Sequence, residues 1–452
     1  MAKPTIVLAT SNGIGMGHLA RATAIALSMQ DFANPVIVSV AGGIAELPSA
    51  TGIRCEYIPG KNRGWMQRKY WDSYLCDRLV AVANEVGASV ISFDGVVPYP
   101  GFIATKLKNP GLKLVWVRRG FWQKNVLRFA LPFQSRLVDR VIEPGDYARE
   151  YDHGPTSSRR DAVLTSPVSL YRKERALDRD SARQALGIDL DKPAVLVQLG
   201  TGDSDMNEKM RAALTGLIGW NNLQIVLTKS PVDSEGNSLV PEGLNIKVVR
   251  YFPLADVLAA FDGAIAATGY NSVHELLPAR IPTVLISNIR GTDDQDARAK
   301  WCHDRGFALR ANHADLSDIT NTVRQLQSSE VRSALSVKCI ELVDANGGTE
   351  IAQLLTAIAL DNDFGRDSVV RKLARILITR GLHTATTVYR KIKPQDFSTN
   401  VSKEPTIFSE EIGVEFLRTS IKGNRRFEQL ITGASDKYRL EREALAARVY
   451  KG

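Results

Sequence analysis

A histidine and an arginine follow a run of closely spaced glycines near the start of the chain. In the stretch SNGIGMGHLARATAIALSM, Gly13, Gly15 and Gly17 precede His18 and Arg21. Glycines let a backbone approach an anion, and a histidine at the start of a helix is well placed to take a proton from a hydroxyl group. We therefore expect a general base at His18, and an acceptor or phosphate loop formed by the glycines and Arg21. A structural histidine, and an arginine paired with a nearby acid, are the alternatives.

Three further candidates follow apolar, strand-like runs in the same half of the chain. Asp94 ends one run and could assist or replace His18 as the base, although an aspartate at a strand end is also a common turn former. Arg118 and Arg119 directly follow another run. Because ligands of parallel sheets bind at the carboxyl ends of the strands, we expect both arginines to open into the crevice beside the glycine loop.

Two segments combine basic and aromatic residues, KNRGWMQRKYW at 61–71 and RRGFWQKNVLRF at 118–129. Such segments suit a lipid headgroup surface, a phosphorylated acceptor or a glycan stacked on an aromatic ring. The alternative is a pair of ordinary loops whose aromatic side chains pack inward.

A second glycine turn lies in the other half of the chain. The stretch VLVQLGTGDSD places Gly200, Thr201 and Gly202 after an apolar run, where backbone N–H groups and a hydroxyl could hold a phosphate. Further on, AATGYNSVHE repeats the order of strand end, turn and helix start. That stretch supplies a second set of candidates, namely Thr268, Gly269, Asn271, Ser272 and Glu275.

Glu275 has two competing interpretations. Asn271 and Ser272 are typical residues for a helix start, and Glu275 falls three positions after Ser272, as in a capping box. The same place near a strand end would also let its carboxylate bind ribose hydroxyls. The spacing does not decide between the two roles.

Common nucleotide and metal motifs fit the sequence poorly. The first glycine loop is GxGxG rather than GxGxxG, no acidic residue follows the second strand, and no GK[ST] is present. Aspartate pairs of the DxD type are too numerous to be diagnostic. They are Asp178/Asp180, Asp189/Asp191, Asp203/Asp205, Asp294/Asp296 and Asp361/Asp363. We expect no metal site, with Asp203 and Asp205 as the alternative.

The elements that must position these residues alternate between strand and helix. Strand-like runs lie at 5–9, 36–40, 89–93, 113–117, 194–199, 223–227, 246–249, 263–266 and 283–286. The alternation predicts two successive α/β units with parallel sheets, followed by helical patterns at 368–380, 409–422 and 425–450. We place the domains at 1–168, 169–358 and 359–452.

Length and charge narrow the class of protein. A chain of 452 residues exceeds one ordinary core, and it contains no apolar stretch of about 18 residues. Its four cysteines are far apart, as expected for reduced thiols. Residues 361–452 contain 18 Lys and Arg against 12 Asp and Glu, so most of the net charge of +9 lies there. The interleaved charges and scarce aromatics make a nucleic-acid partner unlikely. We expect a cytoplasmic protein, with peripheral contact at the inner face of a membrane as an open alternative.

Four segments together resemble one family. GIGMGH, LGTGD, TGYNSVHE and DDQ followed by Arg298-Ala299 are similar, in that order, to motifs of the GT-B nucleotide-sugar glycosyltransferases, most closely the MurG-like branch that transfers N-acetylglucosamine from UDP. The resemblance covers residues 1 to about 355. It implies two Rossmann-like domains facing a crevice, with acceptor binding in the first domain, donor binding in the second, and a helical extension after them.

The resemblance also implies roles for individual residues. Glu275 would hold the ribose hydroxyls, and His18 would deprotonate the acceptor or steady the departing charge. The remaining donor contacts would be Gly200, Thr201 and Ser272 to the diphosphate, the backbone at Tyr251 and Phe252 to the base, and Gln295 with Asp294 to the sugar. The implied reaction is an inverting displacement that needs no cofactor or metal.

Departures from the family pattern leave alternatives open. Asp294 replaces the usual histidine and Arg298 the usual asparagine, so the sugar is not identified. GHLAR resembles the loop of a related nucleotide-sugar hydrolase, in which Arg21 would bind a substrate carboxylate or phosphate. A non-catalytic nucleotide-sugar sensor or a scaffold acting through its basic tail is a further alternative. The acceptor is unknown and could be a glycan, a lipid-linked molecule or a small molecule.

Overall fold

The computed structural model describes residues 2–11, 17–40, 51–61, 68–124, 130–200, 204–228, 239–289, 291–364 and 375. Four of the expected site residues, Gly13, Gly15, Thr201 and Gly202, lie outside the described residues. So do Asp203 and, apart from Arg375, the three helices predicted after residue 365.

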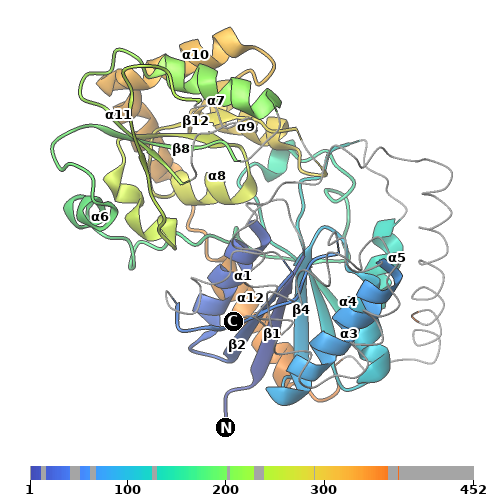
Figure 1. Cartoon of the computed structure of the whole chain (residues 1–452). Coiled ribbons are helices and arrows are strands. Elements are labelled where there is room, and N and C mark those ends of the chain that lie inside the picture. The colour runs from blue at the N-terminus through green and yellow to red at the C-terminus, as the bar shows by residue number, and fades with distance from the viewer. Residues whose placement is uncertain are drawn as a thin grey trace, which may run out of the picture.

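The chain forms two α/β domains, each built on one parallel sheet (Figure 1). The first sheet has the strand order β3-β2-β1-β4-β5-β6-β7, and every pairing in it is parallel. Its strands are β1 (Thr5–Thr10), β2 (Asn34–Ser39), β3 (Arg54–Tyr57), β4 (Val90–Gly95), β5 (Lys113–Arg118), β6 (Arg140–Glu143) and β7 (Val163–Leu164).

The second sheet has the order β10-β9-β8-β11-β12-β13, again entirely parallel. Its strands are β8 (Ala194–Gln198), β9 (Gln224–Leu227), β10 (Asn245–Val248), β11 (Gly263–Ala267), β12 (Thr283–Ile286) and β13 (Leu309–Ala311). The two parallel sheets and the alternation of strands with helices confirm the predicted α/β class.

Helices cover the faces of both sheets. In the first half these are α1 (Gly17–Met29), α3 (Arg68–Glu85), α4 (Pro100–Lys108), α5 (Ala130–Leu137) and the short η1 (Arg149–Tyr151). In the second half they are α6 (Arg179–Leu186), α7 (Ser204–Gly216), η2 (Leu254–Ala260), α8 (Tyr270–Leu276), α9 (Gln295–Asp304), α10 (Leu316–Arg324), η3 (Gln325–Gln327), α11 (Ser329–Lys338), η4 (Cys339–Glu341) and α12 (Gly347–Leu360).

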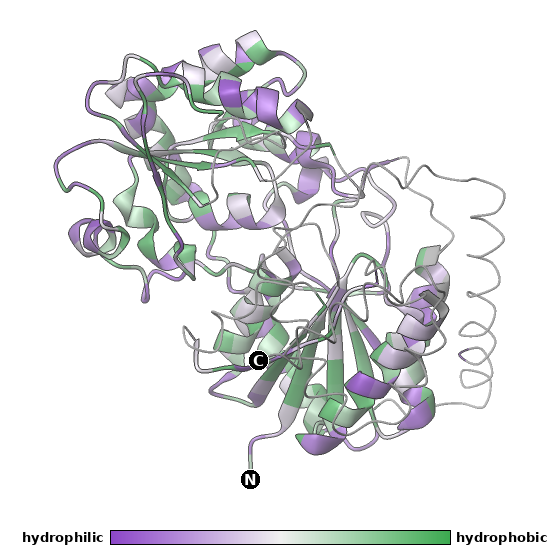
Figure 2. Cartoon of the chain, in the orientation of Figure 1, coloured by the Kyte–Doolittle hydropathy of each residue, from purple (hydrophilic) through white to green (hydrophobic). Residues whose placement is uncertain are grey.

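The apolar strands are explained by burial on both faces of the sheet. In β1, Val7 and Ala9 pack into the core under α3 and α4, whereas Ile6 and Leu8 pack into the core under α1 and α12. A strand covered on both sides needs apolar residues at every position, because successive side chains point to opposite faces. Figure 2 shows the resulting hydrophobic sheets.

The last described helix returns to the first domain. α12 packs against α1, and its Ile351 and Leu355 are fully buried in the core that contains Leu19 (Figure 1). Its carboxyl end is held by Lys113 Nζ, which donates to Ile358 O at 2.8 Å. α12 therefore belongs by packing to the first domain, although it follows the second domain in the chain.

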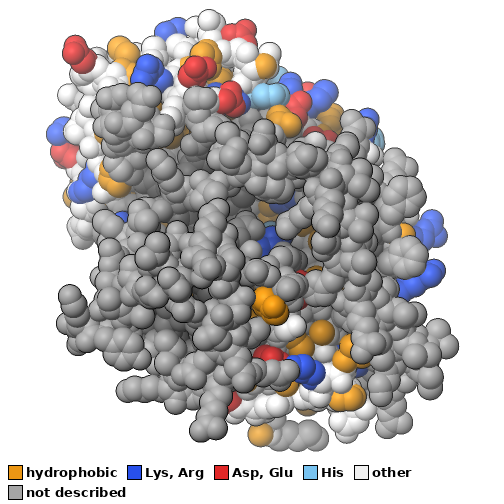
Figure 3. Space-filling view, turned by 45° about the vertical axis from the view of Figure 1, so that its right-hand side comes forward, with side chains coloured by type: hydrophobic (Ala, Val, Ile, Leu, Met, Phe, Trp, Pro, Cys, Tyr) orange, Lys and Arg blue, Asp and Glu red, His pale blue; other side chains and the backbone are white. Residues whose placement is uncertain are grey.

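The described helices include no membrane span, and the face of the described surface drawn in Figure 3 has no charged patch of a single sign. None of the described helices is long and apolar enough to cross a membrane. On the face drawn in Figure 3, the described acidic and basic side chains are interspersed rather than gathered by sign.

A substitution at Gly347, where α12 begins, tests the close contact between α12 and the chain connection at residue 166. A Cβ at this position would lie 2.0 Å from Ser166 O, on the neighbouring connection between the domains. We expect Gly347→Ala to lower the free energy of unfolding by about 1–3 kcal/mol, because the backbone oxygen cannot move without displacing that connection. Urea unfolding followed by circular dichroism measures the change.

Gly111→Ala is the matched control, because its Cβ would approach nothing closer than Asn109 Oδ1 at 3.4 Å. If both variants unfold at the wild-type urea concentration, the close crossing of α12 and residue 166 is wrong.

Candidate functional site

His18, Asp94 and Arg21 meet at the carboxyl ends of two neighbouring strands. β1 and β4 pair side by side, α1 begins just beyond β1, and Asp94 lies near the end of β4. His18 Nδ1 donates to Asp94 Oδ1 at 2.6 Å, and Arg21 Nε donates to Asp94 Oδ2 at 2.6 Å. Arg21 Nη2 also donates to Asp94 Oδ1. The structure thus places Asp94 behind His18, as an assisting group rather than as its replacement.

These contacts assign the proton of the imidazole. Burial alone would raise the pKa of Asp94, but Arg21 and His18 outweigh burial and hold that pKa below its usual value. Arg21 Nη2 also lies 3.2 Å from Nδ1, but the shorter contact of 2.6 Å to an ionised carboxylate, which can only accept, favours the proton on Nδ1 and leaves the lone pair on Nε2. Burial lowers the pKa of His18 despite the bond to Asp94, which keeps the imidazole neutral near pH 7. No described residue bonds Nε2, so a neutral base is available there.

Arg21 does not have the free guanidinium that substrate binding would require. Its side chain is 2% exposed, is bonded to both oxygens of Asp94, and lies 5.1 Å above the ring of Tyr270. Burial and the use of Nε and Nη2 by Asp94 leave only Nη1 without a partner among the described residues, so the structure favours the alternative of an arginine paired with a nearby acid.

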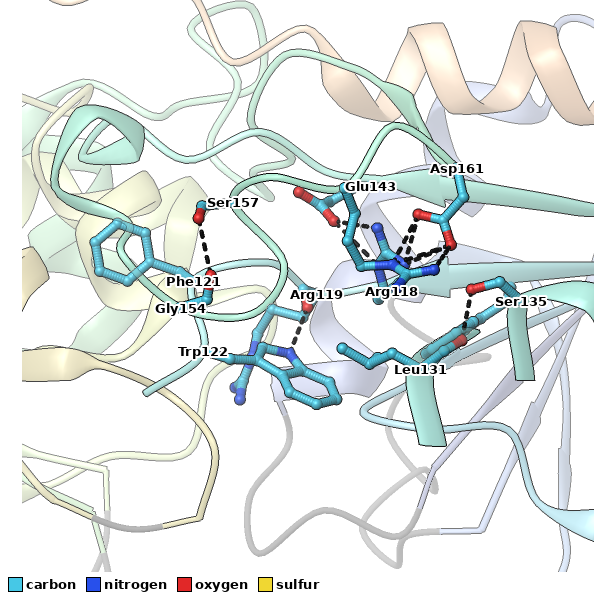
Figure 4. Close-up of polar contacts among 12 residues, drawn as sticks. Arg118, Arg119, Phe121, Trp122, Leu131, Ser135, Glu143, Gly154, Ser157 and Asp161 are labelled. Carbon is cyan, nitrogen blue, oxygen red and sulfur yellow. Dashed lines mark hydrogen bonds and ion pairs between the residues drawn. The ribbon is translucent and has the colours of Figure 1, made fainter. Parts of the chain in front are cut away.

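Arg118 and Arg119 take opposite sides at the end of β5. Arg118 is fully buried, bonds Glu143 Oε2 through Nε at 3.0 Å, and pairs with Asp161 at 3.1 Å. Figure 4 shows Arg118 pointing to these acids while Arg119 points away. The expectation for Arg118 is wrong because consecutive strand residues face opposite ways. Arg119 faces His18 closely enough to lower its pKa.

Arg119 retains unused hydrogen-bond donors. Its Nη2 donates to Thr292 Oγ1 at 3.0 Å and its Nη1 lies 3.7 Å from Asp293, but its Nε is buried without a partner among the described residues. Burial lowers the pKa of Arg119, and the positive charges of Arg21 and Arg298 act in the same direction. An anion bound here would give Nε a hydrogen-bond partner and would also neutralise the buried positive charge.

The aromatic residues of the two basic segments pack inward where the structure describes them. Trp71, Phe121 and Trp122 are each at most 2% exposed, and Trp122 Nε1 donates to Arg119 O at 2.7 Å. Their predicted role as a lipid or glycan surface is therefore wrong, and the ordinary-loop alternative holds for these three side chains.

Glu275 does not form the capping box. α8 begins at Tyr270 with Gly269 as the N-cap, and no side chain caps it, so Glu275 lies about one turn beyond Ser272, the position from which a capping-box side chain reaches back. No described residue bonds its carboxylate. Burial and the nearby Asp256 raise the pKa of Glu275 to about 8. A half-buried carboxylate without a partner fits a ligand-binding role better than a structural one.

The other donor candidates take varied positions. Gly200 has φ of +87° after β8, a left-handed conformation that favours glycine. Ser272 is half-buried on α8, and Tyr251 and Phe252 are half-buried before η2. Thr268 O accepts from Arg298 Nη1 at 3.0 Å.

Asp294 and Gln295 hold the start of α9. Asp294 Oδ1 accepts from Ala297 N at 3.1 Å as the N-cap, and Gln295 Oε1 accepts from Asn288 N at 2.9 Å. The carboxylate of Asp294 thus has a structural partner, whereas the amide nitrogen of Gln295 has no described partner. A contact to a sugar would come from that nitrogen.

Arg298, which stands where the family pattern has asparagine, is buried and joins the two domains. Arg298 Nε donates to Asp146 Oδ2 at 2.9 Å, and its Nη2 donates to Asp293 Oδ1 at 2.9 Å. Asp146 comes from the connection after β6 in the first domain. The start of α8 adds another link, because Asn271 Nδ2 donates to Gly17 O at 3.1 Å. The start of α1, with His18, therefore lies against the start of α8, the helix that also contains Ser272 and, near its end, Glu275.

The described residues contain no group of three or more His, Cys, Asp or Glu side chains that could hold a metal ion. Asp205, one of the aspartates considered for a metal, accepts from Lys209 Nζ at 2.7 Å.

Comparisons with known proteins agree with this architecture. No family model matches the chain. A UDP-N-acetylglucosamine--N-acetylmuramyl-(pentapeptide) pyrophosphoryl-undecaprenol N-acetylglucosamine transferase from Nocardioides sp. is 25% identical over 278 residues, covering 60% of this chain and 73% of the relative. The enzyme of the same name from Oceanobacillus iheyensis is 26% identical over 51% of this chain and 61% of that relative.

The crystal structure of Acinetobacter baumannii MurG matches 78% of this chain and 100% of its own, with a TM-score of 0.50 and 19% identity. The structural match confirms the GT-B fold. The curated relatives confirm the similarity to the MurG-like branch and the glycosyltransferase class that the sequence predicts.

The raised pKa of Glu275 predicts a gain in stability when its charge is removed. Because the folded-state pKa of about 8 lies above the ordinary value of 4.5, the folded protein loses stability as the pH rises from about 4.5 through 8. We expect Glu275→Gln to match the wild type at pH 5 and to exceed it by about 1–3 kcal/mol at pH 9, as expected for removing an unpaired buried charge. Thermal unfolding across this pH range measures the difference.

Glu208→Gln, at an exposed position on α7, is the control and should follow the wild type at every pH. A Glu275→Gln curve that runs parallel to the wild type from pH 5 to 9 would contradict the burial of an unpartnered carboxylate.

Proposed function

We propose that this chain transfers a sugar from a nucleotide sugar, in the first instance a UDP-sugar, to an acceptor hydroxyl, with inversion at the anomeric carbon. One observation carries the proposal: the neutral imidazole of His18 lies at the start of α1, which contacts the start of α8, and α8 presents the unpaired carboxylate of Glu275. A base and a ribose-binding carboxylate on opposite domains are what such a transfer requires.

The proposed reaction is one displacement. His18 Nε2 takes the proton of the acceptor hydroxyl as its oxygen attacks the anomeric carbon. The bond from that carbon to the diphosphate breaks, and the diphosphate leaves with the electron pair. The Asp94 carboxylate, 2.6 Å from Nδ1, stabilises the imidazolium that forms.

Stabilisation of the leaving group is proposed to need no metal or cofactor. Gly200 follows β8 with a left-handed φ, and α7 begins at Ser204, so backbone N–H groups at the start of this helix can meet the diphosphate. The hydroxyl of Ser272 is a further donor. Asp205 does not offer a free carboxylate, because Lys209 already occupies it.

The nucleobase, the transferred sugar and the acceptor are proposed from Glu275 and from the names of the relatives. Glu275 favours a ribonucleotide, since it would accept hydrogen bonds from both ribose hydroxyls, and the backbone at Tyr251 and Phe252 would frame the base. The relatives are named for UDP-N-acetylglucosamine and a pyrophosphoryl-undecaprenol acceptor. By analogy we propose an anionic, lipid-linked acceptor, with Arg119 as its contact, and action at the cytoplasmic face of a membrane.

Donor binding is the first prediction of this proposal. Isothermal titration calorimetry with UDP, GDP, dTDP and UDP-N-acetylglucosamine should find UDP compounds bound at micromolar to millimolar strength. At pH 9, where the carboxyl of Glu275 is ionised, Glu275→Ala should weaken UDP binding by about 1.5–3 kcal/mol, the range for a hydrogen bond to a charged group. Glu208→Ala, on the exposed face of α7, should bind UDP as the wild type does. If none of these nucleotides gives a heat of binding, the proposed nucleotide-sugar site is wrong.

Turnover is the second prediction. UDP release from UDP-N-acetylglucosamine, measured with and without acceptors in which a sugar is linked to a polyprenyl diphosphate, should require the acceptor in a transferase, whereas release to water alone would indicate the hydrolase alternative. His18→Ala should lower kcat by about 10²–10⁴, as expected for loss of a general base, and leave the UDP affinity unchanged. Binding without turnover in any of these assays would favour a nucleotide-sugar sensor.

A further inference from the structure

Arg21 is held between a carboxylate of the first domain and an aromatic ring of the second. Its guanidinium bonds both oxygens of Asp94, and its central carbon lies 5.1 Å from the centre of the Tyr270 ring. Both side chains are at most 5% exposed. The two-point contact with Asp94 orients the guanidinium, and the buried ring face adds a second restraint on the other side of it.

Tyr270 is itself bonded to two segments outside the second sheet, the connection after β6 in the first domain and the chain connection that leads from β7 to α6. Its hydroxyl accepts from Val168 N at 2.9 Å and donates to Gly145 O at 2.8 Å. Its ring lies 4.1 Å from the ring of His274, centre to centre, and His274 in turn stacks on Tyr147 at 4.7 Å. The ring therefore cannot tilt away from Arg21 unless α8, the segment at Gly145 or the connection at Val168 moves.

The same short helix presents the proposed donor contacts. Tyr270 is the first residue of α8, and Ser272 and Glu275 follow within its seven residues. Asn271 Nδ2 ties the start of α8 to Gly17 O, directly before His18. A displacement of α8 would thus be transmitted through Tyr270, Arg21 and Asp94 to the imidazole.

We infer that Tyr270 is a positioning residue, whose ring holds Arg21 and, through Arg21 and Asp94, aligns His18 with the donor site on α8. The role of His18 as a base rests on the proposed function. The positioning of His18 by Tyr270, Arg21 and Asp94 does not depend on it. The charged groups that face His18 are Asp94 from β4, Arg21 from α1 and Arg119 after β5. Without the ring, Arg21 loses one of its two restraints and water reaches the cluster.

The direct test is a titration of His18 by NMR in protein labelled at histidine. The chain has six histidines, and His18→Ala assigns the signal. In Tyr270→Leu we expect the pKa of His18 to rise toward its ordinary value, because water entry relieves the burial that lowers it. Tyr270→Phe keeps the ring but removes the hydroxyl bonds that hold it, so it should shift this pKa less than Tyr270→Leu does.

Tyr147→Leu is the matched control. It removes the other ring that stacks on His274, so it disturbs the same packing without touching Arg21. The inference is overturned if Tyr270→Leu leaves the titration of His18 unchanged, or if Tyr147→Leu shifts it equally. Should Tyr270→Leu fail to fold, Arg21→Lys tests the same link, because an ammonium cannot hold both Asp94 oxygens and a ring face.

Kinetics separate this inference from the proposed function. With UDP-N-acetylglucosamine, Tyr270→Leu should lower kcat roughly tenfold and change KM by less than about twofold, since a misplaced base slows the chemical step rather than binding. Tyr270→Phe, which keeps the ring, should have a higher kcat than Tyr270→Leu. If UDP does not bind to the wild type, the proposed function fails while the titration still decides the role of Tyr270.

Discussion

The buried charge of Asp94 is the constraint on which the site depends. A carboxylate that is 4% exposed must be paired, and Arg21 supplies both a countercharge and two donors. The pairing leaves Asp94 one geometry in which to accept the Nδ1 proton of His18, and that geometry fixes the tautomer of the imidazole. The glycine-led start of α1 and the adjacency of β1 and β4 matter because they bring these three side chains to one strand edge.

A second set of buried charges fixes the two domains relative to each other. Arg298 joins Asp146 of the first domain to Asp293 of the second, and its guanidinium lies 4.8 Å from the centre of the Phe121 ring. Beside it, Gln123 N donates to Thr292 O at 2.8 Å, so the loop after β5 pairs with the segment before α9. Residues expected to contact acceptor and sugar thus belong to one continuous hydrogen-bonded unit.

The sequence predicted most of the sheets but fewer of the contacts. Strands buried on both faces are visible as apolar runs, whereas β3, β7 and β13 lie at sheet edges, are short and escaped notice, as did the four-residue β6. His18 and Arg21 were identified by type, but their sharing of Asp94 depends on strand order across 73 residues. Arg118 was misplaced because a one-residue change in the pleat reverses the side that it faces. The two interpretations of Glu275 could not be separated from the sequence, because capping depends on where α8 begins.

The return of α12 also sets an order for biosynthesis. The core of the first domain contains Ile351 and Leu355, which leave the ribosome after the whole second sheet has been made. The first domain therefore waits with an open apolar face beside α1 until the chain is nearly complete, whereas the second sheet is built from consecutive residues. A nascent chain released before residue 360 would expose that face, so chaperone contact during synthesis is expected to concentrate on the first domain rather than on the second.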